Sequence, residues 1–387
     1  MKLYREIFLA PAMRDIFSDG ALITAMLRYE AAWTRACAAE GFIPETSSAC
    51  IADACARLAS QSLSLEAASR LAGNPVLPLV DALRTEVASR HPEALAHVHF
   101  CTTTQDVLDS ARCLQMGAAF DWLDATLVEI LQVLRGLVDA HRATPCLART
   151  LMRQAKATRF GLLVAHWYTG IADAREQLTR QRARLPLQYG GATGTLEGLG
   201  SAGLAVAART AELLGLVMPT LPWHTRRNWI AETGAALGVL LGAAGKIAND
   251  ISLLSQDEVR ELDEPWAPGR GASTAMAHKR NPIGCAAILA QSIRVQGMIA
   301  TLFSALPQEH TRALGGWQAE WETLPEIWLA AAGASTHLLA ISGGLQVFPE
   351  RMRQNLQAAG WAADDDALQT GIDALLDRAF PSGTPQT

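Results

Sequence analysis

The sequence has few charged residues, few aromatic residues and almost no pattern typical of β-strands. Charged side chains make up 18% of the 387 residues and aromatic side chains 6%. Soluble domains usually have roughly 25% charged residues. Half of the residues are apolar, and alanine, leucine, valine and isoleucine supply most of them. The low charge fraction predicts that part of the surface is buried against other subunits.

Several protein classes are disfavoured by what is missing. A net charge of −5 and the lack of a basic stripe argue against nucleic acid as a partner. No uninterrupted apolar run approaches the roughly 20 residues of a membrane helix, and the first residues have no secretory pattern. The seven cysteines are scattered without the spacing of a metal finger. We therefore expect a cytoplasmic protein with reduced thiols and no membrane association.

The pattern that is present is helical. Alanine and leucine recur at the i, i+3, i+4 and i+7 spacing of an amphipathic helix. The longest stretch, 106–142, contains no proline and predicts a helix on the order of 50 Å long. Further helices are expected at 20–40, 47–72, 157–184, 226–256, 282–306 and 318–341. Helices of this length favour an all-α fold, a long-helix bundle in which several chains pack together.

The chain divides into three expected regions. We predict an N-terminal helical domain at 1–98, a central long-helix bundle at 99–341 and a short C-terminal helical segment at 342–387. The tail loses its periodicity from about residue 361, and residues 362–366 and 381–385 are expected to be frayed.

The polar segment 99–106 lies directly before the longest helix. Thr102 with Gln105, or Thr103 with Asp106, matches a capping box. The same hydroxyls beside the free N–H groups of a helix start are also suited to bind a carboxylate. His99, taken alone, is more typical of a packed or capping histidine than of a catalyst.

Four cations gather in the segment 148–161, namely Arg149, Arg153, Lys156 and Arg159. The simplest interpretation is the solvated start of the helix at 157–184. Cations at a helix N-terminus oppose the helix dipole. That conflict favours an anion-binding role for one or two of them.

The segment 263–282 separates two long predicted helices and is rich in glycine, proline and small residues. Asn281 and Pro282 together predict a helix start, with asparagine as the cap and proline in the first turn. Lys279 then lies just before a helix N-terminus, which favours a carboxylate site. The residues fit a lid that closes on an anionic substrate, and a plain flexible linker is the alternative.

At this loop the sequence resembles the fumarase/aspartase superfamily, whose signature is Gly-Ser-Ser-x-Met-Pro-x-Lys-x-Asn-Pro. Counting back from Lys279 aligns Ser273 with the catalytic serine, while Thr274 replaces the second serine and Ala277 replaces the proline. Ala272 is an apparent insertion. Residues 99–110 and the pair Arg149-Thr150 resemble the first and second conserved regions. The stretches 188–200, 222–225, 245–250 and 307–325 are similar to the 3-carboxy-cis,cis-muconate cycloisomerase branch.

The resemblance covers roughly residues 10–345 and implies a chemistry beside a carboxylate. It implies a homotetramer whose active sites each draw on three subunits, a small polycarboxylate substrate, and no metal or organic cofactor. Ser273 would exchange the proton at carbon, and His99 joins it in the catalytic set. Substrate binding falls to Thr103, Thr104, Arg149, Thr150, Lys279, Asn281 and Arg312, of which Lys279 and Asn281 would stabilise the aci-carboxylate. The C-terminal helical domain of the superfamily is shorter here.

Three functions stay open. Leu151 stands where most superfamily lyases have a histidine; cycloisomerases also lack that histidine, which favours lactonisation of a carboxymuconate. The departures around Ser273 leave room for a β-elimination lyase that releases a fumarate-type product from a substituted succinate. An inactive structural paralogue is the third possibility. The joint presence of Ser273, Lys279, Asn281, Thr103 and Arg149 argues against it.

Overall fold

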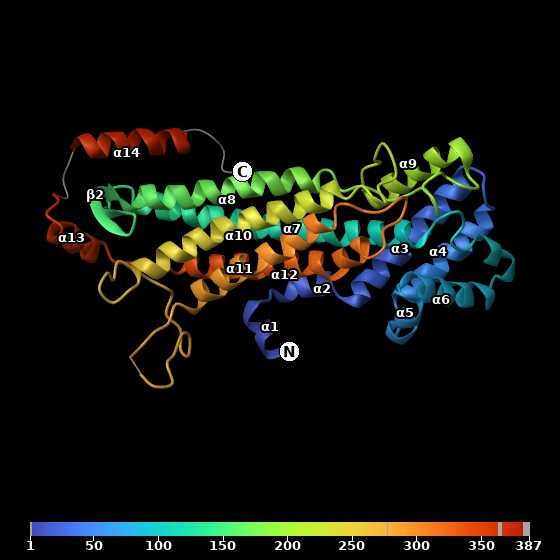
Figure 1. The fold of residues 1–387 in the computed structure, drawn as a ribbon, viewed down its shortest axis with the longest axis horizontal. Helices are drawn as coiled ribbons and strands as arrows, with labels where there is room; N and C mark the ends of the chain where they lie inside the picture. The colour runs from blue at the N-terminus through green and yellow to red at the C-terminus, as the bar shows by residue number, and fades with distance from the viewer. Residues whose placement is uncertain (1, 277, 363–365, 382–387) are drawn as a thin grey trace.

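The computed structural model describes residues 2–276, 278–362 and 366–381 of the chain. Long helices run along the longest axis of an elongated molecule, and Figure 1 shows them as a bundle with a smaller helical cluster at one end. The bundle helices are α7 (Thr104–Ala140), α8 (Phe160–Arg182), α10 (Asn228–Leu254), α11 (Ile283–Ser304) and α12 (Gly316–Gly343). The expectation of a mostly helical chain is confirmed.

The longest helix, α7, forms the axis around which the bundle is built. Its buried positions include Leu123, Leu127, Ile130 and Leu134, which share one face because they are spaced by three or four residues. The predicted helix at 106–142 is confirmed within two residues at each end. Because α7 contacts α8 and α12 directly, its apolar face is enclosed by the other bundle helices.

A second apolar core lies in the helical cluster at the end where α7 begins. It draws on α3 (Asp19–Ala39), α4 (Glu45–Ala59), α6 (Val76–Ala88) and α9 (Gly203–Leu214). The short helices α5 (Glu66–Ala72), η1 (Pro92–His97) and η2 (Gly200–Ala202) complete this cluster. Before it, α1 (Lys2–Phe8) and α2 (Pro11–Ile16) pack on the bundle. The domain limits at 98 and 341 stay a prediction.

Two short strand pairs interrupt the helical fold. β1 (Pro145–Thr150) pairs antiparallel with β2 (Arg153–Arg159), and β3 (Leu262–Asp263) pairs with β4 (Gln346–Val347). The cations at 149, 153, 156 and 159 therefore lie on a hairpin, and their interpretation as a helix start is wrong. Most of the hairpin beyond Leu147 is exposed or half-buried, so it lacks the alternation of apolar and polar residues by which a strand is recognised.

The helix caps also differ from the expected ones. Thr103 is the N-cap residue of α7 but its side chain makes no capping bond, so the capping-box prediction is wrong. The carboxylate of Asp106 binds His224 and the backbone N–H of Gly191 instead. At α11 the N-cap residue is Pro282 and not Asn281.

The free N–H groups at the start of α11 have a different acceptor. The buried carboxylate of Glu264 accepts from the N–H groups of Gly284 and Cys285 at 3.2 and 2.7 Å. The Asn281 amide instead donates to the carbonyl of Gly271 at 3.1 Å. Glu264 acts from outside the helix, across 20 positions of sequence, which is why local sequence did not identify it as the cap.

The C-terminal region contains α13 (Pro349–Ala358) and α14 (Asp366–Ala379). The expected loss of helical structure after residue 361 is therefore wrong for 366–379. Arg142 anchors α14 through ion pairs with Asp373 and Asp377. Of the frayed segments expected at 362–366 and 381–385, residues 363–365 and 382–385 lie outside the described residues.

Three helices, α10, α11 and α12, are long and apolar enough to cross a membrane by length and composition alone, which the search for uninterrupted apolar runs did not anticipate. Within the chain, 56% of the apolar window of α10 and 67% of that of α12 are buried, but only 33% of that of α11. Ile283, Ile293 and Phe303 of α11 are exposed. Large exposed apolar patches mark protein–protein or membrane interaction sites, or ligand-binding grooves.

Candidate active site

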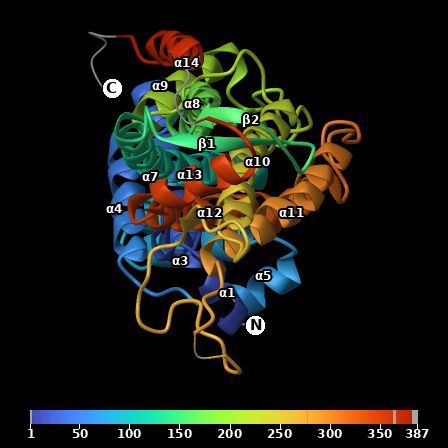
Figure 2. The same ribbon diagram turned by 90° about the vertical axis from the view of Figure 1, so that its left-hand side faces the viewer.

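The predicted site residues form three separate groups within one chain. His99, Thr103, Thr104 and Arg312 lie at the end where α7 begins. Arg149 and Thr150 lie on the β1–β2 hairpin beyond the other end of α7, and Ser273, Lys279 and Asn281 lie in the loop before α11. Figures 1 and 2 both show this loop projecting away from the hairpin.

His99 is held in a defined orientation by a buried glutamate. Its Nδ1 lies 2.6 Å from Oε1 of Glu30, and the two side chains are 17% and 2% exposed. Burial alone lowers the pKa of His99, but the charge and hydrogen bond of Glu30 outweigh it and raise the pKa above its ordinary value. Glu30 comes from α3 and was not predicted from the sequence. The pair leaves Nε2 of His99 as the ring atom that can exchange a proton.

Thr103 and Thr104 lie at the first turn of α7, where backbone N–H groups are unpaired and the helix dipole favours an anion. Both are half-buried. Among the described residues, neither hydroxyl forms a hydrogen bond with another residue. The role of the two hydroxyls in binding a ligand carboxylate stays a prediction.

Arg312 reaches the same end of α7 from the segment between α11 and α12. Its Nη1 donates to Oε1 of Gln105 at 2.6 Å, and Nη2 donates to the carbonyl oxygens of Gly191 and Ala192 at 2.8 and 3.0 Å. Burial lowers the pKa of Arg312 from its ordinary value. Arg312 therefore lies beside Gln105 of α7 with its donors directed to protein acceptors, and its role in substrate binding stays a prediction.

A second histidine–carboxylate pair lies beneath this group. His224 Nε2 is 2.7 Å from Oδ1 of Asp106, and both side chains are buried. The other oxygen of Asp106 accepts from Gly191 N–H at 2.9 Å and from the Thr102 hydroxyl at 3.3 Å. The Thr102 hydroxyl also contacts the buried hydroxyl of Tyr29 at 2.9 Å. The stretch Pro222-Trp-His-Thr225 was noticed in the sequence, but no role was assigned to His224.

A buried charge cluster fixes the helices around this end. The guanidinium of Arg227, 2% exposed, forms ion pairs with Asp109 and Glu320 at 2.6 and 2.5 Å. Trp317 donates its indole N–H to Asp109 at 3.0 Å. The Arg227 charge lowers the pKa of Asp109 against the opposing effect of burial. This cluster connects the starts of α7, α10 and α12. The pairing of Arg227 with Asp109 and Glu320 was not predicted from the sequence.

The hairpin group consists of Arg149, Thr150 and the exposed tip. Arg149 donates Nη1 and Nη2 to the two oxygens of Glu261 at 3.0 and 2.8 Å, and Glu261 is 1% exposed. Arg149 therefore has a partner within the chain, so its predicted role in substrate binding competes with this pair. At the tip, Leu151 and Met152 have positive φ angles, and Leu151 is 97% exposed.

The loop group is organised around Ser273. Its Oγ accepts hydrogen bonds from the N–H groups of Ala275 and Met276 at 3.3 and 3.1 Å. Gly271 has a positive φ of 64° and a Cβ there would collide with Asn281, so this close approach requires glycine. Lys279 is exposed. Ala277, at the position of the signature proline, lies outside the described residues.

The distance between groups follows from helix geometry. α7 has 37 residues, which is about 55 Å at 1.5 Å per residue. His99 and Thr103 precede its first residue, and Arg149 follows shortly after its last. The same applies to α11, whose 22 residues separate Ser273 from Arg312, a length of about 33 Å. The predicted site residues of one chain cannot surround a single small ligand.

Residues 8–297 match the protein family described as Lyase. The 3-carboxy-cis,cis-muconate cycloisomerase of Pseudomonas aeruginosa is 42% identical, over 92% of this chain and 78% of that protein. The nitrosuccinate lyase of Streptomyces davaonensis is 38% identical, over 94% of this chain and 78% of that protein. The crystal structure of 3-carboxy-cis,cis-muconate lactonizing enzyme from Pseudomonas putida matches with a TM-score of 0.87 and 38% identity, over 98% of this chain and 83% of that one.

Proposed function

Since the chain belongs to the Lyase family within the fumarase/aspartase superfamily, we propose that it is a cycloisomerase that closes a carboxymuconate to a lactone. The chain is an enzyme of that superfamily. The observation that carries the substrate proposal is the 42% identity to a named carboxymuconate cycloisomerase across most of both chains. Leu151 at the hairpin tip fits this proposal, because it supplies no imidazole for acid–base chemistry.

In the lactonising direction, a carboxylate of the substrate adds to its own double bond and the enzyme delivers one proton to carbon. The intermediate beside the adjacent carboxylate carries nearly two negative charges. Lys279 would stabilise it electrostatically, and the Asn281 amide would donate to it after leaving Gly271. Preorganised donors of this kind contribute on the order of 3–4 kcal/mol each to transition-state stabilisation.

Ser273 is the proposed proton-transfer residue. A free serine hydroxyl is a poor base, so its alkoxide form needs stabilisation by nearby charge and N–H donors. The N–H groups of Ala275 and Met276 already point at Oγ, and Lys279 follows in the same loop. His99, oriented by Glu30, is the proposed second catalytic group. Thr103, Thr104, Thr150, Arg149 and Arg312 are proposed to hold the carboxylates of a small polycarboxylate.

We further propose that each active site is assembled from several copies of the chain in a homotetramer. The support is the length of α7 and α11, which keeps the group at the start of α7 apart from the hairpin and from the Ser273 loop within one copy. The exposed apolar face of α11 supplies a surface for such assembly. A groove between α10 and α11, lined by Gly245, Ser292 and Ile293 among others, lets helices of another copy approach closely. Burial between copies would also explain apolar helices in a cytoplasmic enzyme without a membrane partner.

An ultraviolet assay tests the substrate proposal. The purified protein is mixed with 3-carboxy-cis,cis-muconate, and loss of the conjugated diene absorbance is the expected result. A second candidate, a lyase acting on a substituted succinate, is favoured by the 38% identity to nitrosuccinate lyase. Nitrosuccinate is therefore tested in parallel, and appearance of fumarate absorbance with no loss of diene would contradict lactonisation. Ser273→Ala protein serves as the blank for both substrates.

A further inference from the structure

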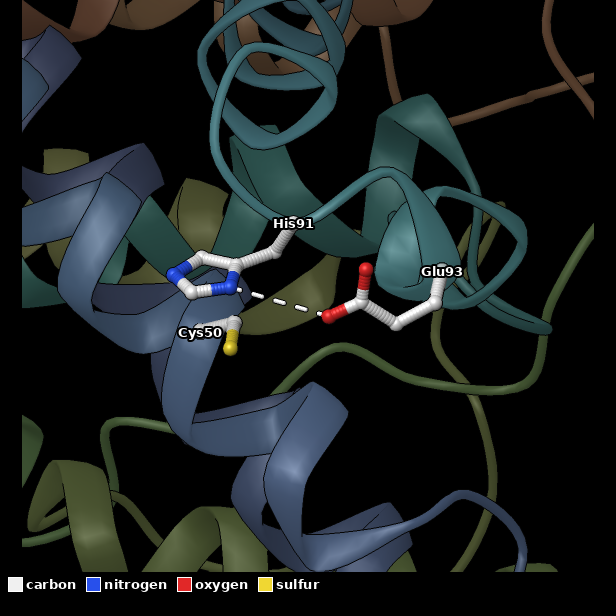
Figure 3. A group of neighbouring side chains, drawn as sticks. All are labelled: Cys50, His91 and Glu93. Atoms are coloured by element: carbon white, nitrogen blue, oxygen red, sulfur yellow. Dashed lines mark ion pairs between the residues drawn. The ribbon is translucent and has the colours of Figure 1, made fainter.

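Three side chains with metal-binding atoms gather in the helical cluster, outside the three groups above. Cys50 lies on α4, His91 lies directly before η1, and Glu93 lies in the first turn of η1. One ligand atom from each lies within 4.8 Å of the others. Figure 3 shows His91 and Glu93 turned toward each other above Cys50, with 3.6 Å between Nδ1 and Oε1.

The backbone around these side chains is fixed by the fold. Pro92 stands between the two ligands of η1 and restricts that turn. His91 N–H donates to the carbonyl of Val87 at 2.7 Å, and the buried Ala94 donates its N–H to the His91 carbonyl at 2.9 Å. On α4, the fully buried Ile51 anchors the helix next to Cys50. Little backbone order would have to be gained on binding an ion.

The combination of sulfur, imidazole nitrogen and carboxylate oxygen is typical of zinc. Ligand atoms around a tetrahedral zinc are separated by about 3.5 Å, given bond lengths of about 2.0–2.3 Å. The spacing of His91 and Glu93 already matches this value. The Cys50 sulfur lies within 4.8 Å of both of these atoms, so it has to approach them further to bind the same ion. Sulfur disfavours magnesium and calcium, which bind oxygen ligands.

The charge of the three ligands and the exposure of Cys50 also fit a zinc site. A Cys50 thiolate, a neutral His91 and an ionised Glu93 carry two negative charges, which balance a divalent ion. All seven cysteines are free thiols, and only Cys50 and Cys101 are not fully buried. We propose that Cys50, His91 and Glu93 bind one Zn²⁺ per chain, with water in the fourth position.

Such an ion would join α4 to η1 at the start of the segment that leads to His99. A bond of 3.1 Å between His97 Nδ1 and the Ser47 hydroxyl already connects these two elements. Because the unfolded chain lacks the site, the free energy of metal binding adds to the stability of the folded state. The predicted consequence is a more stable helical cluster in the presence of zinc.

The test uses the full-length protein, Zn²⁺ titrated by calorimetry, and Co²⁺ as a spectroscopic substitute. Wild type should bind one Zn²⁺ per chain, raise its Tm with Zn²⁺, and give a thiolate-to-cobalt charge-transfer band. Cys50→Ser should lose the band and about tenfold or more in Zn²⁺ affinity. Glu93→Gln, an exposed and structurally mild change, should also weaken binding. Cys101→Ser, the matched thiol control, should keep the band.

Three results would overturn the site. These are no Zn²⁺ binding by wild type at micromolar concentrations, equal binding by Cys50→Ser, or loss of the cobalt band in Cys101→Ser alone. Circular dichroism of each variant establishes that it is folded. If Cys50→Ser fails to fold, the comparison of Glu93→Gln with wild type decides the question in its place.

Discussion

Asp106 and His224 are joined by a 2.7 Å hydrogen bond across 118 positions of sequence, with both side chains buried. The same carboxylate accepts from Gly191 and Thr102. One side chain at the start of α7 therefore fixes the segment before α10, the glycine-rich loop at 190–200 and the threonine segment. Each of these segments borders the group formed by His99 and Arg312.

We expect Asp106→Asn to lower the free energy of unfolding by about 1–3 kcal/mol, because two buried donors lose a charged acceptor. Urea denaturation measures the loss. Thr102→Val removes the bond of 3.3 Å to Asp106 and the contact of 2.9 Å with Tyr29 but keeps the carboxylate. It is the comparison variant and should cost less than Asp106→Asn, about 1 kcal/mol. Equal losses in the two variants would contradict the central role of Asp106.

Ser273→Ala should reduce turnover by a factor on the order of 10³ or more, as expected for loss of a proton-transfer residue. Oligomeric state and binding of a substrate analogue should be unchanged, as measured by light scattering and calorimetry. Thr274→Ala removes the neighbouring, exposed hydroxyl and should keep most of the activity. Turnover near the wild-type value in Ser273→Ala would rule out the assignment of this serine.

Mixing two inactive variants tests whether sites are shared. Ser273→Ala and Arg312→Ala carry defects at opposite ends of α11. If each site takes these residues from different copies, random reassembly of an equal mixture should restore about a quarter of the wild-type activity. The controls are each variant taken alone through the same denaturation and refolding. Absence of any recovery, with mixed oligomers demonstrated, would mean that each copy supplies a complete site.

Glu30→Gln should lower the pKa of His99, since the charge and hydrogen bond of Glu30 raise it. A raised pKa means that protonated His99 stabilises the fold; this stabilisation is complete below the ordinary histidine pKa of about 6.5. It is lost as the pH rises through the folded-state value. The free energy of unfolding of the wild type should therefore exceed that of Glu30→Gln by about 2 kcal/mol at low pH. This difference should shrink at alkaline pH.

Two measurements check this prediction. Urea unfolding at several pH values gives the stability difference, and histidine NMR titration gives the pKa of His99 directly. Glu322→Gln removes an exposed carboxylate on α12 and is the control. If the stability difference between wild type and Glu30→Gln grew with pH, the proposed stabilisation of protonated His99 by Glu30 would be contradicted.

Arg227→Leu should cost about 3–5 kcal/mol of stability, because it leaves Asp109 and Glu320 buried without their cation. The control is Arg182→Leu, whose ion pair with Asp121 is largely exposed, and which should cost about 1 kcal/mol or less. Urea denaturation of both variants makes the comparison. Comparable losses of stability in the two variants would indicate that the buried cluster stabilises the fold no more than an exposed ion pair does.

The sequence identified the long helices because their apolar spacing is continuous. α7, α10, α11 and α12 each lie within about two residues of the predicted limits. The hairpin at 145–159 was missed because its residues beyond Leu147 are largely exposed and polar on both faces. Periodicity reports burial, and an exposed hairpin has little of it.

The sequence supplied candidate residues for the site but not the side chains that pair with them. The positions of Ser273, Lys279 and the threonine segment followed from resemblance to a signature. Glu30, Glu261 and Glu264 were not identified, because each pairs with a residue that is distant in sequence or in another element. Long-range electrostatic pairs leave no local pattern, so only the folded chain reveals which charges are already neutralised.

The 37-residue span of α7 has a consequence for inheritance and evolution. If the three groups meet only between copies, a defective chain spoils sites in its neighbours as well as its own contribution. A variant that folds and assembles but lacks Ser273 would have a dominant-negative effect on activity when expressed together with the normal chain. A variant that cannot assemble would be harmless by comparison. Selection would then act more strongly against variants that fold and assemble without activity than against unstable ones.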